Sequence, residues 1–268
     1  MRPDLAGKVA LITGGTAGVG LATGLELGAA GAQCWLTFRF GSADEDAIRA
    51  AFAERGAPEP VFVQSDIGLA EDNAELVARL QAEVECLDIF ISNAANALIV
   101  GELGDWSLRG LQQSVRGSVW PTLGICQALI EAFGAPPAYV IAMSSDGPDH
   151  HAPGYGMIAA TKAMLEAAVR YLAVELGPRG CRVNAIRSRG VPTKSLDAVF
   201  GPELRAFTAG HAPERWWVPA EEVAGAALAL CSGRLDAING QVLTIDRGGA
   251  FADNLMGLFV ERERRGAS

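Results

Sequence analysis

Short apolar runs alternate with longer amphipathic segments along the whole chain of 268 residues. Apolar runs bounded by turn residues predict buried strands, and apolar positions at three- and four-residue intervals predict helices. Strands are expected at 8–13, 33–38, 61–64, 87–92, 138–144, 182–186 and 242–245. Helices are expected at 18–30, 44–55, 71–84, 103–116, 118–133, 155–176 and 219–231.

This alternation predicts the fold class. Parallel strands need crossover connections, and right-handed crossovers place helices on both faces of one sheet. We therefore expect an α/β protein with a doubly wound parallel sheet of the Rossmann type. Half of the residues are apolar, enough for a large core, and no linker interrupts the pattern. Residues 1–268 are expected to form a single domain.

The first expected strand ends in a glycine-rich turn that runs directly into a helix. The sequence TGGTAGVG at 13–20 contains the cofactor-binding candidates Gly14, Thr16, Gly18, Val19 and Gly20. Glycine lets the backbone approach a pyrophosphate closely, and a helix N-terminus offers it free N–H groups. The strand-to-helix context favours a dinucleotide site over the alternative, a tight turn without ligand.

Further cofactor contacts are expected where the next strands end. An NAD site usually carries an acid after the second strand, but this chain has Arg39 with Ser42 nearby. A guanidinium suits a 2′-phosphate, so NADPH is expected in preference to NADH, the alternative being an arginine that points to solvent. Asp66 can accept from the adenine amino group or cap a helix. Asn93 and Ala94 leave room for the cofactor ribose.

Composition excludes several other classes of function. The 31 acidic and 22 basic residues give a net charge of −9, which argues against nucleic-acid binding. The apolar runs are too short to span a bilayer. Five single cysteines without a leader segment predict buried thiols in a reduced, cytoplasmic protein. The adjacent His150 and His151 lack a third partner, so no metal site is expected.

One helix carries the most informative pair of polar residues. Tyr155 and Lys162 lie seven positions apart, which places them on one helix face about 10 Å apart along the axis. The residue four before the lysine is Ile158, which has no proton to give. Tyr155 is expected to be a functional hydroxyl, the alternative being an aromatic side chain that only packs.

Together these landmarks resemble the short-chain dehydrogenase/reductase family over nearly the whole chain. The matching segments are TGGTAGVG at 13–20, Asp66-Ile67, SNAA at 92–95, Ser144-Ser145, the Tyr155–Lys162 helix, RVNAI at 182–186 and DRGG at 246–249. Ile67 is therefore also expected at the cofactor site. Most members of this family reduce carbonyls with a serine, a lysine and a tyrosine four before it, assisted by an asparagine. Here Ile158 replaces that tyrosine, and no asparagine occurs between Asn96 and Asn184.

The Tyr-x6-Lys spacing is similar to that of the family's enoyl-thioester reductases. This resemblance implies that Tyr155 stabilises an enolate, that Lys162 holds the nicotinamide ribose and that Ser145, ten residues before the tyrosine, assists. It implies NADPH-dependent reduction of a conjugated C=C in a small-molecule or carrier-protein-bound acyl substrate of fatty acid or polyketide biosynthesis. One alternative is a ketoreductase with Tyr155 or Ser145 as donor. Another is a non-redox member, such as a cyclase, dehydratase or binding subunit.

The segment after the sixth expected strand departs from the family. Val191 and Thr193 are expected to contact the carboxamide, but Arg187 and Arg189 stand where the family has small residues and a glycine. These arginines bind an anionic substrate or a phosphopantetheine, or they form salt bridges with acidic residues. The aromatic stretch at about 190–218 is expected to form a substrate lid. The resemblance also implies a homo-oligomer, a tetramer or dimer, with the last strand and 251–260 in the interface.

Overall fold

Seven parallel strands form one sheet in the computed structural model, which describes residues 3–40, 44–96, 98–211, 216–252, 256–257, 260 and 262. The order within these ranges is β3-β2-β1-β4-β5-β6-β7. The strands are β1 (Val9–Ile12), β2 (Gln33–Phe38), β3 (Val61–Gln64), β4 (Ile89–Ser92), β5 (Tyr139–Ser145), β6 (Arg182–Ser188) and β7 (Val242–Ile245). The predicted Rossmann-type fold is confirmed.

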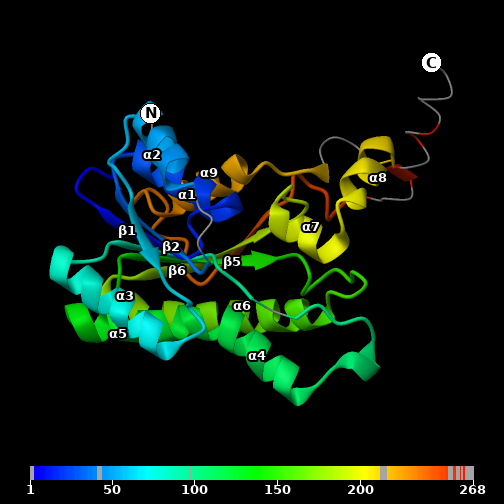
Figure 1. Cartoon of the computed structure of the whole chain (residues 1–268), viewed down its shortest axis with the longest axis horizontal. Helices are drawn as coiled ribbons and strands as arrows, with labels where there is room; N and C mark the ends of the chain where they lie inside the picture. Colours follow the sequence, from blue (N-terminus) through cyan, green and yellow to red (C-terminus); the bar gives the residue numbers. More distant parts are fainter. Residues whose placement is uncertain are drawn as a thin grey trace.

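Helices cover both faces of this sheet (Figure 1). On one face lie α1 (Gly18–Ala29), α2 (Glu45–Glu54) and α9 (Ala220–Leu230). On the other lie α3 (Ala70–Glu83), α4 (Leu108–Ser118), α5 (Trp120–Phe133) and α6 (Gly156–Leu176). Two further helices, α7 (Lys194–Phe200) and α8 (Glu203–His211), lie beyond the carboxyl ends of the central strands. Short 3₁₀ turns occur at η1 (Leu103–Asp105) and η2 (Gly177–Arg179).

The strands are apolar on both sides because each side of the sheet is covered. Leu36 and Ile141 belong to the core beneath α1 and α9, whereas Trp35 and Val140 belong to the core on the opposite face. Burying a side chain of this kind contributes roughly 1.5–3 kcal/mol. Strand order reverses at β1 and β4, so the loops after these two strands run in opposite directions and leave a crevice between them.

Several boundaries differ from those predicted. β6 continues to Ser188, because its register with β5 extends to Arg187 opposite Ser144 and Ser188 opposite Ser145. Arg187 therefore lies within the strand rather than after it. The helix expected at 103–116 is split into η1 and α4, since the Ser107 side chain accepts from Gly110 N at 3.0 Å and caps a new helix.

Other expectations need smaller corrections or fall outside the described ranges. The lid stretch contains α7 and α8, which the apolar pattern did not predict as helices. Four cysteines are buried as expected, but Cys86 is exposed because it lies in the turn between α3 and β4. None of the helices in the described ranges is long and apolar enough to cross a membrane. Ser42 and parts of 190–218 and 251–260 lie outside the described residues.

Candidate functional site

The glycine turn after β1 has a geometry that only glycine tolerates. Gly14 and Gly18 have φ angles of +62° and +53°. A Cβ at Gly20 would overlap the carbonyl oxygen of Gly14. The Asn93 side chain donates to the carbonyl oxygens of Thr13 and Gly14 at 2.9 and 3.2 Å, which ties this turn to β4. No side chain caps the start of α1, so its N-terminal N–H groups remain open to an anion.

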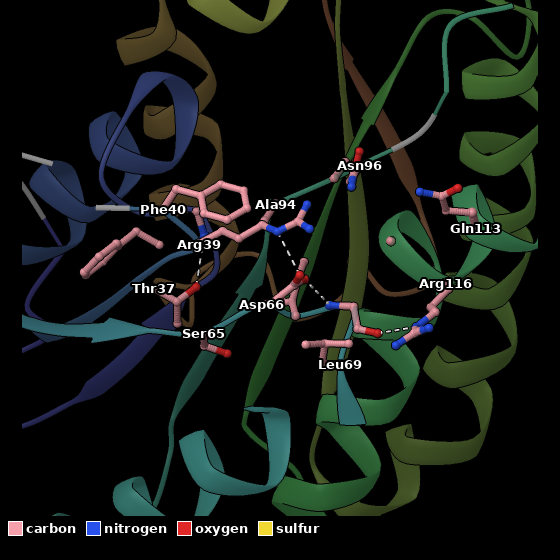
Figure 2. A pocket seen from close by; sticks show the side chains of 16 residues that line it. Thr37, Arg39, Phe40, Ser65, Asp66, Leu69, Ala94, Asn96, Gln113 and Arg116 are labelled. Atoms are coloured by element: carbon pink, nitrogen blue, oxygen red, sulfur yellow. Dashed lines mark hydrogen bonds and ion pairs between the residues drawn. The ribbon is translucent and has the colours of Figure 1, made fainter. Parts of the chain in front are cut away.

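A pocket of about 450 Å³ opens beside this turn, at the carboxyl ends of β2, β3 and β4 (Figure 2). It brings together five of the residues expected at the cofactor site: Gly14, Arg39, Asp66, Ile67 and Ala94. The predicted catalytic residues Ser145, Tyr155 and Lys162 are not among its lining residues. The pocket therefore fits the adenosine end of a dinucleotide site.

Arg39 and Asp66 form an ion pair across this pocket, with 2.8 Å between Arg39 Nε and Asp66 Oδ2 (Figure 2). Arg39 therefore reaches into the pocket instead of pointing only to solvent. Asp66 Oδ1 also accepts from Gly68 N at 3.0 Å. Asp66 does not cap α3, because Leu69 is the N-cap residue of that helix. The guanidinium of Arg39 also lies over the ring of Phe40, 4.7 Å from its centroid.

The pocket includes polar residues that the sequence pattern did not indicate. Ser65 is buried, and its Oγ has no hydrogen-bond partner among the described residues. Arg116 and Gln113 line the pocket from α4, and Arg116 Nε donates to the Gly68 carbonyl at 2.5 Å (Figure 2). Residues on a helix face carry no motif, so only the spatial arrangement identifies them.

These features fit NAD(P)H. The open helix N-terminus and the glycine turn suit the pyrophosphate, and the unpartnered Ser65 hydroxyl and Asp66 suit the polar edges of an adenosine. The guanidinium groups of Arg39 and Arg116 supply positive charge at the same end of the site, beside the adenosine. Thr193 lies against the turn, because its Cγ2 lies 3.2 Å from the position of a Cβ at Gly18.

Tyr155 lies at the other end of the crevice, immediately before the first residue of α6, as its N-cap. Its ring packs on Gly147, where a Cβ would lie 2.6 Å from the tyrosine Cε1, and stacks on Phe200 of α7 with centroids 5.8 Å apart. Burial raises the pKa of the phenol, the Ser145 side chain lowers it and the charge of Asp146 raises it. The net direction is upward, so Tyr155 carries its proton at neutral pH.

Lys162 and Ser145 complete the predicted set. Lys162 is buried and its Nζ donates to the Met143 carbonyl of β5 at 2.6 Å. Burial lowers the pKa of this lysine to about 8, against an opposing effect of Glu166. The structure brings Ser145 close enough to Tyr155 to influence its pKa, yet the Ser145 Oγ forms no hydrogen bond of good geometry. Both hydroxyls are therefore available to a ligand.

A buried ionic network adjoins Lys162. Glu166 Oε1 accepts from Ser144 Oγ at 2.6 Å, and both Glu166 oxygens pair with Arg187, at 3.1 and 2.7 Å. Arg187 also contacts Asp149. Glu166 was not predicted as a site residue, although an acid one turn after a buried lysine on an apolar helix face is a usable sequence signal.

The second arginine that departs from the family is also paired, since Arg189 Nε lies 3.2 Å from Asp146 Oδ2. For both arginines the structure therefore supports the salt-bridge interpretation over an anion-binding one. Val191 is buried in the core, and Thr193 accepts from Leu196 N at 3.2 Å to cap α7. Within the described residues no group of three or more histidine, cysteine or acidic side chains could hold a metal ion.

The parallel sheet, the glycine turn at its crevice and the Tyr155–Lys162 helix define a Rossmann-type oxidoreductase. The family model described as Enoyl-(Acyl carrier protein) reductase matches residues 14–250. The chain therefore belongs to this family of short-chain dehydrogenases/reductases, and it is an NAD(P)H-dependent oxidoreductase. This assignment does not support the non-redox alternative.

Relatives of known name extend over most of the chain. An enoyl-acyl-carrier-protein reductase (NADH) of Aquifex aeolicus is 28% identical over 265 residues, 97% of this chain and 96% of the relative. A 1-cyclohexenylcarbonyl-CoA reductase of Streptomyces collinus is 30% identical over 247 residues, covering 90% and 86%. The crystal structure of a short chain dehydrogenase from Burkholderia cenocepacia J2315 in complex with NADP has a TM-score of 0.79 at 28% identity, covering 92% and 99%. Other relatives are named as dehydrogenases of a 2-dehydro-3-deoxygluconate and of a 3β-hydroxysteroid.

Proposed function

We propose that the protein is an NADPH-dependent enoyl-thioester reductase, which reduces a conjugated C=C in an acyl substrate of fatty acid or polyketide biosynthesis. The observation that carries the proposal is the position of the protonated Tyr155 at the N-cap of α6, seven residues before the buried Lys162, with Ile158 in between. The two relatives named as reductases of an enoyl-acyl carrier and a cyclohexenylcarbonyl-CoA support it.

The side chains present suit the charge that develops in such a reaction. When bound, NADPH supplies a hydride for the β-carbon of the substrate. Negative charge then accumulates on the thioester oxygen, and Tyr155 donates its proton or a hydrogen bond there. The unpartnered hydroxyl of Ser145 offers a second donor beside it. The buried ammonium of Lys162 adds a positive charge at the end of β5, where little water screens it.

Water exclusion is the expected role of the lid. Phe200 stacks on the Tyr155 ring from α7, and Asp197 of the same helix forms a bidentate pair with Arg205 of α8, at 2.8 and 2.9 Å. This pair joins α7 to α8. A lid of this kind removes solvent from around the thioester oxygen, which strengthens the electrostatic interaction of Tyr155 and Lys162 with that oxygen.

One assay tests the reaction type. NADPH oxidation is followed with a short 2-enoyl thioester and, separately, with a 3-ketoacyl thioester, for the wild type and Tyr155→Phe. We expect turnover of the enoyl substrate and a loss of about 10²–10³-fold in kcat for the variant, the usual cost of removing one oxyanion donor. Turnover of the ketone alone contradicts the proposal. So does an enoyl activity that survives in Tyr155→Phe.

The preference for NADPH rests on Arg39. A 2′-phosphate would take the place of the Asp66 carboxylate as partner of this guanidinium, with Arg116 nearby. Arg39→Leu is expected to reduce the ratio of NADPH to NADH affinity by about 10–100-fold, since a charge-assisted hydrogen bond contributes roughly 1.5–3 kcal/mol. Arg49→Leu is the matched control, because Arg49 is another paired arginine and lies outside this pocket. An unchanged ratio in Arg39→Leu contradicts the preference.

Reduction of a carbonyl is the second candidate function. The proximity of the Ser145 and Tyr155 hydroxyls favours it, because a serine and a tyrosine beside each other suit a ketone oxygen as well as a thioester oxygen. Relatives named as dehydrogenases of hydroxyl-bearing substrates lend it further support. The 3-ketoacyl arm of the assay distinguishes it from the first proposal.

A further inference from the structure

The loop of residues 146–154 joins the two hydroxyls of the candidate site, Ser145 at the end of β5 and Tyr155 at the start of α6. Val100 N donates to the Gly154 carbonyl of this loop at 3.3 Å. The other backbone hydrogen bonds within the loop, among the residues that the structure describes, close local turns. Local turns shape a loop but do not fix it against the sheet, so the orientation of the two hydroxyls depends on side-chain contacts.

Arg187 supplies one such contact. Its Nη1 donates to Asp149 of the loop, while its Nε and Nη2 donate to Glu166 of α6. Only 12% of the Arg187 side chain and 5% of the Glu166 side chain are exposed. A buried guanidinium held at three nitrogens has one geometry, so it joins β6, α6 and the loop rigidly.

Arg189 supplies the second contact, two residues further along. It pairs with Asp146, the first residue of the loop, and both side chains are largely buried. Its guanidinium also lies over the ring of Trp216, 5.7 Å from the centroid. Trp216 in turn packs closely on Gly190, where a Cβ would lie 2.7 Å from the Trp216 carbonyl oxygen. Arg189 therefore contacts both the Trp216 ring and Asp146 of the loop.

We propose that Arg187 and Arg189 are positioning residues that tether the 146–154 loop at Asp149 and Asp146 and so align the Ser145 and Tyr155 hydroxyls on one substrate oxygen. This inference rests on the proposed reductase function. The contact at Asp146 lies next to Ser145 in the chain, and the contact at Asp149 lies about midway between Ser145 and Tyr155. A misplacement of about 1 Å at a reacting group can cost roughly 10²-fold in rate, so a loosened loop lowers kcat.

Two variants break the tether at separate points. Asp149→Asn removes the negative charge of the loop partner of Arg187 and leaves the Arg187–Glu166 pair intact, and Arg189→Met removes the second contact. For each we expect kcat with the enoyl thioester to fall about 10–100-fold, and the NADPH dissociation constant to stay within about 2-fold of the wild type. Backbone hydrogen exchange in 146–154 is expected to accelerate.

Rescue and a matched control separate alignment from general damage. Exchanging the second pair, as Arg189→Asp combined with Asp146→Arg, is expected to recover most of the kcat lost in Arg189→Met, because the coupled charges are restored. Arg182→Met is the control. Arg182 also lies on β6, but its Nε donates to the Asp236 carbonyl at 2.7 Å, away from the loop. Its kcat is expected to match that of the wild type.

Three results overturn the tether: a wild-type kcat in Asp149→Asn and Arg189→Met, loop exchange at the wild-type rate in both, or equal losses in Arg182→Met. If Arg189→Met does not fold, Asp149→Asn decides alone, since 59% of the Asp149 side chain is exposed and its replacement leaves the core untouched. If the wild type reduces neither the enoyl nor the keto thioester, the proposed function fails. The tether is then tested by backbone hydrogen exchange in 146–154 alone.

Discussion

Replacing Lys162 by methionine is expected to stabilise the folded protein at pH 7 while abolishing the proposed reduction. Burial lowers the pKa of Lys162 from its ordinary 10.5 to about 8. At about 1.36 kcal/mol per pH unit, keeping this ammonium charged in the interior costs roughly 3 kcal/mol. Methionine is unbranched and of similar length, so it fills the same space without that cost.

The expected net gain is smaller than this cost. Losing the hydrogen bond from Lys162 Nζ to the Met143 carbonyl destabilises the variant by about 1 kcal/mol and reduces the gain by that amount. Glu166 keeps Ser144 and Arg187 as partners, so its charge stays compensated. We therefore expect the free energy of unfolding of Lys162→Met at pH 7 to exceed that of the wild type by about 2 kcal/mol, measured by denaturant titration.

The pH dependence gives a second check with a definite sign. The unfolded chain keeps the Lys162 proton up to pH 10.5, whereas the folded protein releases it near pH 8. Between these values the unfolded state binds more protons, so the stability of the wild type rises with pH relative to the variant. The advantage of Lys162→Met is expected to shrink toward about pH 10. A variant less stable than the wild type at pH 7, or a pH-independent difference, refutes the reasoning.

Lys8→Met is the matched control for this prediction. The hydrogen bond to Asp88 and the charge of that residue raise the pKa of Lys8, which lies largely at the surface. A raised pKa gives the opposite dependence of stability on pH. The charged Lys8 stabilises the folded protein below the pKa that it has in the unfolded chain, and this stabilisation is lost as the pH rises through the higher pKa of the folded protein. Lys8→Met is therefore expected to bring no stabilisation at pH 7.

Two further predictions concern the glycine turn and the lid. Gly20→Ala is expected to abolish measurable NADPH binding in a fluorescence titration, because its Cβ would overlap the Gly14 carbonyl oxygen, and wild-type affinity contradicts this geometry. Gly225→Ala is its control for NADPH binding, since nothing lies within 4 Å of a Cβ there. In the interior of α9, alanine in place of glycine is expected to stabilise the helix by about 1 kcal/mol. Phe200→Ala is expected to raise kcat/KM for a branched or cyclic acyl thioester relative to a straight one, because it removes the ring stacked on Tyr155; an unchanged ratio contradicts a lid role.

The fold could be predicted from the sequence because its signals are local. Short apolar runs and amphipathic periods report which faces are buried, and a doubly wound sheet requires little else. The glycine turn was equally readable, since positive φ at Gly14 and Gly18 is a property of the residue type. Boundaries were less predictable where long-range contacts set them. The extension of β6 to Ser188 depends on its register with β5, which no local pattern reports.

The candidate site was only partly predictable, because its charges act in pairs. The sequence marked Arg39, Arg187 and Arg189 as unusual but could not name their partners. Their partners are acids at distant or loop positions: Asp66, Glu166, Asp149 and Asp146. Charge pairing over long sequence separations has no periodicity, so only the folded chain reveals it. The roles assigned to Tyr155, Lys162 and Ser145 are predictions.

Unpartnered buried polar atoms give an independent view of where a ligand binds. Among the described residues, five such side-chain atoms occur: Trp35 Nε1, Ser65 Oγ, Asn73 Oδ1, Ser145 Oγ and His150 Nδ1. A buried polar group without a partner costs about 1–3 kcal/mol, so a protein tolerates it most readily where a ligand supplies the missing bond. Ser65 lies in the adenosine-end pocket and Ser145 beside Tyr155, at the two ends of one crevice. A dinucleotide and the acyl substrate that we propose, bound end to end in that crevice, would account for both.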